Sequence, residues 1–284
     1  MIRPFSDSII RTSTYRPLTL AALTLSLVLV FNAAPAMADT YDAASEAYDV
    51  GDYPKAFSIA EPLANDGNPN AQFLVGLMYD FGDGTVLNDL DAILWYTKAA
   101  KQGHISAQFN LAYMYDHGEG VDEDNQQAVL WYTRSAEQGD VSAQLNLALM
   151  YDFSEEGVPR DLYKAIDWYN AAARQDNPDA QYNLALIYDE GEGVAENDPQ
   201  AVYWYQRAAM LGKAAAQTNL GVMYYNGEGI DDNTVEGLAW TYIAAEAEHE
   251  IAIENIEVFE DGASRREIRR AKRRVNELRD SMNR

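Results

Sequence analysis

All five tryptophans of this 284-residue chain occupy the same position of a repeated unit. They are separated by 36, 37, 36 and 36 residues. An Ala-Gln pair recurs with the same period, and a tyrosine follows eight residues after each of its alanines. The pairs begin at Ala71, Ala107, Ala143, Ala180 and Ala216. A fixed period of this size is typical of stacked repeat arrays, so we predict one elongated domain.

Each repeat is expected to begin with an amphipathic helix that ends at glycine. In the third repeat, Ala107, Leu111 and Met114 fall on one face of a helix predicted over residues 107–116. Gly118 and Gly120 follow this helix. Because glycine readily takes positive φ values, the two residues predict the turn that ends the helix, not a phosphate site.

A second helix is expected after this turn. Asp124 is a favourable N-cap for it, and the helix carries Trp131 and stops at Gly139. The other repeats hold Asp or Asn at the N-cap position, namely Asp52, Asn88, Asp161, Asn197 and Asn233. Neither helix can bury its apolar face alone, so the repeats must stack. We therefore interpret the tryptophans as core residues between repeats, in preference to a ligand site.

Three repeats depart from this pattern, and the first of them has Ile59 in the tryptophan position. The turn of the fourth repeat reads Ser-Glu-Glu-Gly over residues 154–157, with one glycine fewer and one residue more than its counterparts. This difference predicts a local change in the geometry of the array. The sixth repeat has Glu248 in place of the final glycine, and we expect its second helix to run on.

Residues 1–38 lie outside the repeats and predict a secretory signal peptide. Arginines precede a 14-residue apolar run from Leu18 to Phe31, and a small-x-small cleavage site ends at Ala38. The run is short for a membrane span of about 20 residues, although an uncleaved anchor is the alternative. We expect cleavage between Ala38 and Asp39, and a periplasmic or secreted protein with no later membrane span.

A basic amphipathic helix is predicted at the C-terminus, in residues 263–284, after a repeat domain of residues 39–262. Ser264 and Glu267 form a capping box at its start. Its apolar positions recur at helical spacing, at Ile268, Ala271, Val275, Leu278 and Met282. We expect this helix to close the last repeat, with binding to a membrane surface or a partner as the alternative.

The repeat domain is strongly acidic. The whole chain has a formal net charge of −24. Residues 39–262 hold 9 basic and 41 acidic side chains, whereas residues 263–284 hold 9 basic and 3 acidic ones. An acidic body repels polyanions, which argues against nucleic acid or anionic lipid as a partner. Solubility is the simpler explanation of this charge, and a basic partner is the more specific one.

The sequence offers no catalytic constellation. It has three histidines and no cysteine. It also lacks the His-Glu-x-x-His and Gly-x-Ser-x-Gly motifs, a phosphate loop and a dinucleotide fingerprint. Acidic turn residues such as Asp116, Glu119 and Asp122 do not have the spacing of a calcium loop. We therefore expect no enzymatic activity, no cofactor and no metal site.

Together these residues resemble the Sel-1-like repeat family, a branch of the tetratricopeptide superfamily. The family pattern is Ala-x3-Leu-Gly-x2-Tyr, Gly-x-Gly-Val, a capping Asp, Ala-x2-Trp-Tyr, and Ala-Ala before a Gly. Residues 107–139 follow it, with Ala112 in the Gly position, and the similarity extends from about Tyr41 to Ile251. The resemblance implies an all-α fold, a right-handed α–α superhelix of about six helix-turn-helix repeats and a C-terminal capping helix.

The resemblance also implies a binding face. In tetratricopeptide relatives, the residues two, six and nine positions after the alanine of a repeat tend to line the concave side. In this chain those positions form an apolar stripe that ends in an acidic residue in four consecutive repeats, as in a binding groove. Packing within a tightly wound array is the alternative use of the stripe. The candidate partner-binding residues are Phe73, Asp80, Phe109, Tyr113, Asp116, Leu145, Leu149, Asp152, Tyr182, Leu186, Asp189 and Tyr225.

A row of asparagines runs parallel to this stripe, at Asn110, Asn146, Asn183 and Asn219. It either clamps a bound backbone or forms a hydrogen-bond ladder between repeats.

From these features we expect an exported, non-enzymatic scaffold or regulator. It would bind a protein or peptide, basic or amphipathic in character, on the concave face. A hydrolase acting on cell-wall or β-lactam substrates is disfavoured, because the chain lacks a nucleophile constellation. A cell-surface factor that binds a host protein is a further alternative.

Overall fold

The computed structural model describes residues 40–283, so the predicted signal peptide and its cleavage site lie outside the described residues. The elements of this range are all α-helices, and most helices that are consecutive in the chain pack against each other. This arrangement is the predicted all-α solenoid. The described chain divides into an N-terminal unit (residues 40–150 and 154–159) and a C-terminal unit (residues 151–153 and 160–283).

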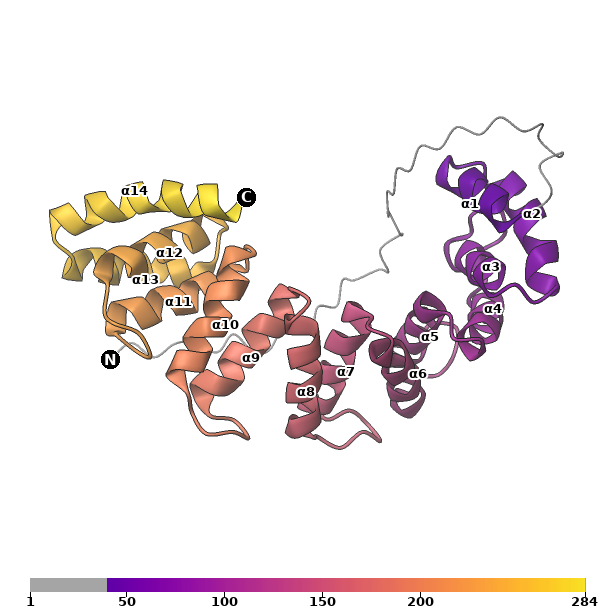
Figure 1. Ribbon diagram of the computed structural model, residues 1–284, viewed down its shortest axis with the longest axis horizontal. Coiled ribbons are helices and arrows are strands. Elements are labelled where there is room, and N and C mark those ends of the chain that lie inside the picture. Colours follow the sequence, from indigo (N-terminus) through magenta and orange to yellow (C-terminus); the bar gives the residue numbers. More distant parts are fainter. Residues whose placement is uncertain (1–39, 284) are drawn as a thin grey trace, which may run out of the picture. The chain divides into compact units, whose positions relative to one another are not determined.

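In the N-terminal unit, helices follow one another in pairs (Figure 1). They are α1 (Tyr41–Asp49), α2 (Tyr53–Asn65), α3 (Pro69–Phe81), α4 (Asp89–Lys101), α5 (Ile105–His117), α6 (Asn125–Glu137) and α7 (Val141–Phe153), the last three residues of which belong to the C-terminal unit. The first helix of a repeat begins two residues earlier than predicted. In α5 the reason is His104, whose Nδ1 accepts a hydrogen bond from the backbone N–H of Ala107 at 3.2 Å.

The C-terminal unit continues the pairs (Figure 1). Its helices are α8 (Leu162–Ala173), α9 (Pro178–Glu190), α10 (Asp198–Met210), α11 (Ala214–Asn226), α12 (Thr234–Glu246), α13 (Glu250–Gly262) and α14 (Arg265–Met282). The predicted extension of the sixth repeat's second helix was wrong. Glu248 takes a φ of 60°, as the replaced glycine would, and the chain turns into α13. Ser264 and Glu267 form the predicted capping box of α14.

The glycine turns have the predicted structural role. Gly120 has a φ of 72°, and a Cβ atom added to it would lie 2.4 Å from Cβ of Asp89 in α4. The turn therefore needs glycine both for its backbone conformation and for its close approach to the preceding repeat. In the fourth repeat, where a glycine is lost, Ser154 takes a φ of 62° and an isolated bridge joins Glu155 to Val158.

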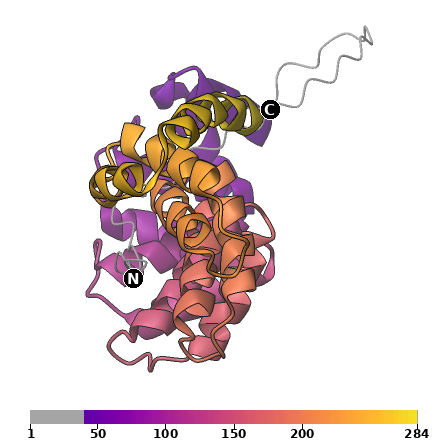
Figure 2. The ribbon, with the colours of Figure 1, turned by 90° about the vertical axis from the view of Figure 1, so that its left-hand side faces the viewer.

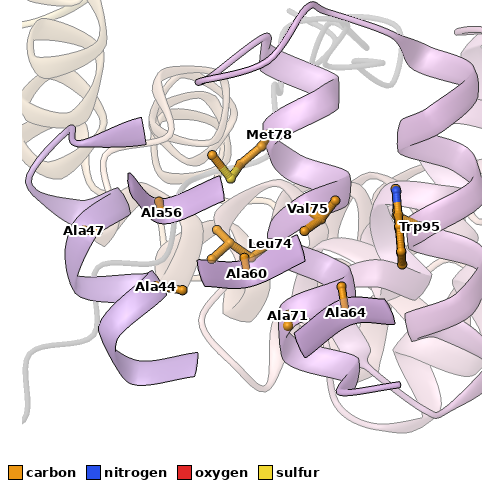
Figure 3. Packing of buried hydrophobic residues seen from close by; sticks show 10 residues of the cluster. All are labelled: Ala44, Ala47, Ala56, Ala60, Ala64, Ala71, Leu74, Val75, Met78 and Trp95. Atoms are coloured by element: carbon orange, nitrogen blue, oxygen red, sulfur yellow. The ribbon is translucent and has the colours of Figure 1, made fainter. Parts of the chain in front are cut away.

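Small residues and tryptophans form the core between helices. In the N-terminal unit, alanines of α1, α2 and α3 surround Leu74, Val75 and Met78, with Trp95 at the edge of the cluster (Figure 3). The tryptophans at positions 95, 131, 204 and 240 are buried, as predicted, and the one at position 168 is partly exposed.

The glutamine of each Ala-Gln pair links one repeat to the next. Nε2 of Gln108 donates to the carbonyl oxygen of Ala100, in the last turn of the preceding second helix, at 3.1 Å. Gln72, Gln144, Gln181 and Gln217 make the equivalent bond. The carbonyl oxygen of Ala100 also accepts from the backbone N–H of Gly103 at 3.0 Å, so the glutamine adds a second hydrogen bond to a buried carbonyl at the helix end.

Candidate functional site

In the N-terminal unit, the predicted partner face is only partly accessible. Phe109, Leu145 and Leu149 are buried, whereas Phe73 and Tyr113 remain partly exposed. The two exposed rings lie against histidines. Phe73 stacks on His104, with ring centroids 4.5 Å apart, and Tyr113 stacks on His117 at 3.9 Å. The accessible part of this face is therefore aromatic.

In the C-terminal unit, the same face is more deeply buried. Tyr182 and Leu186 are almost fully enclosed. Tyr225 is partly exposed, and its ring stacks on Phe259 of α13 with centroids 3.9 Å apart. Packing between helices thus uses most of the apolar stripe in each unit. The partner-binding role of these residues stays a prediction.

The acidic row at the ends of the first helices accepts hydrogen bonds from tyrosines of the second helices. In the N-terminal unit, the Tyr96 hydroxyl donates to Asp80 at 2.9 Å, and the Tyr132 hydroxyl lies 3.4 Å from Asp116. In the C-terminal unit, the hydroxyls of Tyr169 and Tyr205 donate to Asp152 and Asp189, both at 3.1 Å. These four tyrosines are buried. Each aspartate therefore has a structural contact within its own repeat.

The asparagine row completes these contacts and forms a ladder between repeats. Nδ2 of Asn146 donates to the Tyr132 hydroxyl at 3.1 Å, and Nδ2 of Asn219 donates to the Tyr205 hydroxyl at 3.0 Å. Asn110 and Asn183 occupy the equivalent positions, and hydrogen bonding by each of them opposes the rise in the pKa of Tyr96 and Tyr169. Each tyrosine hydroxyl thus donates to an aspartate of its own repeat and accepts from an asparagine of the next. The asparagines were predicted either to clamp a bound backbone or to form a hydrogen-bond ladder between repeats, and the structure shows the ladder.

Burial changes the acidity of this row. It raises the pKa of Asp189 to about 6, although the hydrogen bond from Tyr205 partly opposes the change. Burial also raises the pKa of Asp152, against the effect of Arg160, whose Nη2 lies 3.2 Å from Oδ1 of that carboxylate. The pKa of each buried tyrosine in the row is raised by burial and by the neighbouring aspartate.

A second accessible surface lies on α4 and the turn before it, and the sequence analysis missed it. It consists of Val86, Leu87, Leu90 and Leu94, which are 83%, 59%, 66% and 50% exposed. A comparison between repeats could have identified it, because the third repeat has Asp122, Glu123 and Gln126 at the positions of the first three. Contiguous exposed apolar side chains of this kind mark protein interaction sites, ligand-binding grooves or aggregation-prone surface.

Neither a metal site nor a membrane span is evident within residues 40–283. No three acidic or histidine side chains there gather closely enough to hold a metal ion. None of the helices described here combines the length and apolar character that crossing a bilayer requires.

Comparisons with known proteins identify the repeat. The family model described as Sel1 repeat matches residues 69–104, 105–140, 141–177, 178–213 and 214–249. A search of curated proteins finds no significant match.

Two solved structures show the same fold. A Sel1 repeat protein from Oxalobacter formigenes is 32% identical over 73% of this chain and 85% of its own, with a TM-score of 0.68. A protective antigen with an SLR fold from uropathogenic Escherichia coli strains is 26% identical over 84% of this chain and 60% of its own, with a TM-score of 0.54. Repeats matched over most of the helical region, together with this fold, place the chain in the Sel1 repeat family.

Proposed function

We propose that this protein is an exported, non-enzymatic scaffold that binds a basic or amphipathic segment of another protein. Sel1 repeat proteins act in general as scaffolds for protein–protein interaction. The proposal for this chain rests on the accessible aromatic and acidic side chains of the N-terminal unit. Phe73 and Tyr113 are partly exposed beside Asp80 and Asp116, on neighbouring first helices.

Apolar and charged contacts would have different roles at such a surface. Aromatic rings that become buried on binding supply affinity and slow dissociation. Carboxylates near the surface attract a basic partner before contact and speed association. His117 lies next to Asp116, with its Nδ1 3.5 Å from Oδ2 of that aspartate.

The binding proposal can be tested on a partner recovered from periplasmic extract, by surface plasmon resonance over a series of salt concentrations. Tyr113→Ala should mainly raise the dissociation rate. Asp80→Asn combined with Asp116→Asn should mainly lower the association rate and flatten its salt dependence, because exposed charges act over a Debye length of about 8 Å. The amide oxygen of asparagine can still accept the tyrosine hydrogen bonds.

A matched control separates this face from the other accessible surface. Leu90→Gln places the residue of the third repeat on the exposed surface of α4 and should leave both rates unchanged. Unchanged rates in the first two variants would refute the proposed face. A loss of binding only in Leu90→Gln would assign the partner to α4.

Export is the second part of the proposal. It is supported by the apolar run from Leu18 to Phe31 and the site that ends at Ala38. N-terminal sequencing of the protein made in its own cells should begin at Asp39. A membrane-bound product that begins at Met1 would instead indicate an anchor.

The absence of catalysis is the third part. No nucleophile, base and orienting group occur in a known motif of this sequence, and Gly-x-Gly forms turns. Incubation with labelled peptidoglycan and with a β-lactam should give no product above the rate without protein. Turnover of either substrate would favour the hydrolase alternative.

A further inference from the structure

The C-terminal helix α14 uses one face to attach to the C-terminal unit. Its buried side chains are Ala271, Val275 and Leu278, and the helix lies over α12 in both views (Figures 1 and 2). Three of its basic residues make salt bridges to neighbouring helices. Arg274 pairs with Glu236 at 2.7 Å, Arg279 pairs with Glu246, and Lys272 lies 3.5 Å from Glu260.

Five other basic residues of α14 face outward. Arg265, Arg269 and Arg273 follow at four-residue intervals, with Arg266 and Arg270 beside them. These five arginines, the arginine stripe, are all exposed, and none makes a salt bridge or side-chain hydrogen bond within the described residues. Guanidinium groups bind carboxylates through paired hydrogen bonds, so the stripe is suited to an anionic partner.

Helix α13 presents the complementary charge. Its outward face carries Glu250, Glu254, Glu257 and Asp261, all exposed and spaced to fall on one side of a helix. These four residues, the acidic stripe, form no salt bridge within the described part of the chain. The opposite side of α13 is buried through Ala252, Asn255 and Phe259.

The two helices also border a shared hollow, which is lined partly by apolar side chains and partly by Glu246, Lys272, Asn276 and Arg279. Both α13 and α14 pack on α12, and the space between them measures about 450 Å³. Its apolar lining includes Tyr242 and Ala245 of α12, Ile256 of α13 and Val275 of α14. On α13, Ile253 and Val258 are 52% and 49% exposed beside the acidic stripe. Helices α13 and α14 thus offer opposite charges, and α13 adds exposed apolar side chains.

We propose that this surface joins two copies of the chain into a dimer, with the arginine stripe of each copy on the acidic stripe of the other. A two-fold symmetric interface uses one patch twice, so the patch must be complementary to itself. Stripes of opposite charge on two helices that pack on the same neighbour, α12, meet this requirement. This inference goes beyond the proposed partner binding and is independent of it.

An anionic membrane suits the arginine stripe less well. A helix that binds in the membrane interface inserts its apolar face, and the apolar face of α14 is already buried against α12. The repeat domain, with 41 acidic and 9 basic side chains, would also be repelled by anionic lipid. A second copy of the chain presents an arginine stripe as well as an acidic stripe, so attraction between opposite stripes offsets part of this repulsion.

Sedimentation velocity of the purified protein at low and high ionic strength tests for the dimer. We expect a dimer at low salt and dissociation near 1 M salt, where the Debye length falls to about 3 Å. A protein that stays monomeric at low salt and high concentration would overturn the proposal.

Exchanging the charges tests the pairing of the stripes. One variant combines Glu254→Lys with Glu257→Lys, and the other combines Arg269→Glu with Arg273→Glu. Each variant alone should lose the dimer, because the first reduces the charge of the acidic stripe from −4 to 0 and the second reduces the charge of the arginine stripe from +5 to +1. An equal mixture should form a heterodimer, and the chain with all four substitutions should dimerise again. The exchanged residues make no salt bridge or side-chain hydrogen bond within residues 40–283, so circular dichroism should be unchanged.

Two further outcomes decide against the proposal. The control Asp167→Lys with Glu190→Lys changes the net charge by the same amount as the glutamate variant, at exposed positions of α8 and α9. It should leave the dimer intact. Equal loss of the dimer in this control would show that net charge alone controls association. If the arginine variant loses the dimer and the glutamate variant keeps it, another acidic surface is the partner, and the proposed pairing is wrong.

Discussion

Replacement of Tyr205 by phenylalanine isolates one step of the ladder between repeats. Tyr205 is fully buried in the C-terminal unit. Its hydroxyl donates to Asp189 at 3.1 Å and accepts from Nδ2 of Asn219 at 3.0 Å. The substitution removes only the hydroxyl group, so the ring keeps its contacts and no large cavity forms.

The expected loss follows from the two bonds. A hydrogen bond to a charged group contributes about 1.5–3 kcal/mol, and a neutral one about 0.5–1.5 kcal/mol. Asn219 is buried, so water cannot replace its lost acceptor, whereas Asp189 is partly exposed and can be hydrated. Because of this hydration we expect the free energy of unfolding to fall by about 2–3 kcal/mol at neutral pH.

Denaturant unfolding followed by circular dichroism measures this change, and hydrogen exchange locates it. Tyr203→Phe is the matched control, because Tyr203 lies two residues away and is 45% exposed. Within residues 40–283 its hydroxyl accepts a hydrogen bond from the partly exposed side chain of Arg207, so the control should change stability by less than about 0.5 kcal/mol. If Tyr205→Phe is as mild as the control, the ladder does not stabilise the array and this reasoning is wrong.

The remaining predictions concern the core and the dependence on pH. Trp131→Ala should lower the free energy of unfolding by about 3–5 kcal/mol, and an unchanged melting temperature would contradict a core role for this side chain. Because the pKa of Asp189 is raised to about 6, the folded protein holds a proton that the unfolded chain loses near pH 3.9, so this group makes stability fall as pH rises between those values. Asp189→Asn should remove that part of the pH dependence in thermal melts, and an identical slope in both proteins would argue against the raised pKa.

The repeat period was sufficient to predict the fold, because each recurring residue has a local structural task. Trp131 lies in the core, and Gly139 lies at the end of a helix, as the sequence predicted. Asp124 caps α6 by accepting from the N–H groups of Gln126 and Gln127. These tasks depend on residues close in sequence or one period away, so the pattern itself contains the information.

Substituted turn positions were harder to predict. The left-handed conformation costs a non-glycine residue about 1–2 kcal/mol, and this cost suggested that α12 would continue through Glu248. The structure instead keeps the turn at Glu248, and Asp176 takes the same conformation with a φ of 60°. Continuing the helix would prevent α13 from packing on α12, and the lost burial of Ala252 and Phe259 outweighs the backbone cost. Local propensity does not include that tertiary contribution.

The candidate site shows what repetition can and cannot indicate. Asn146 and Asp116 both contact the hydroxyl of Tyr132, and the other central repeats have Asn and Asp at the same positions. The periodicity of these residues therefore reflects packing as much as binding. A side chain that serves a single partner has no reason to recur with the repeat. The exposed apolar cluster on α4 and the charged stripes of α13 and α14 occur once each in the described chain. Departures from the period are therefore the better guide to specific contacts in this array, and recurring residues the better guide to its stability.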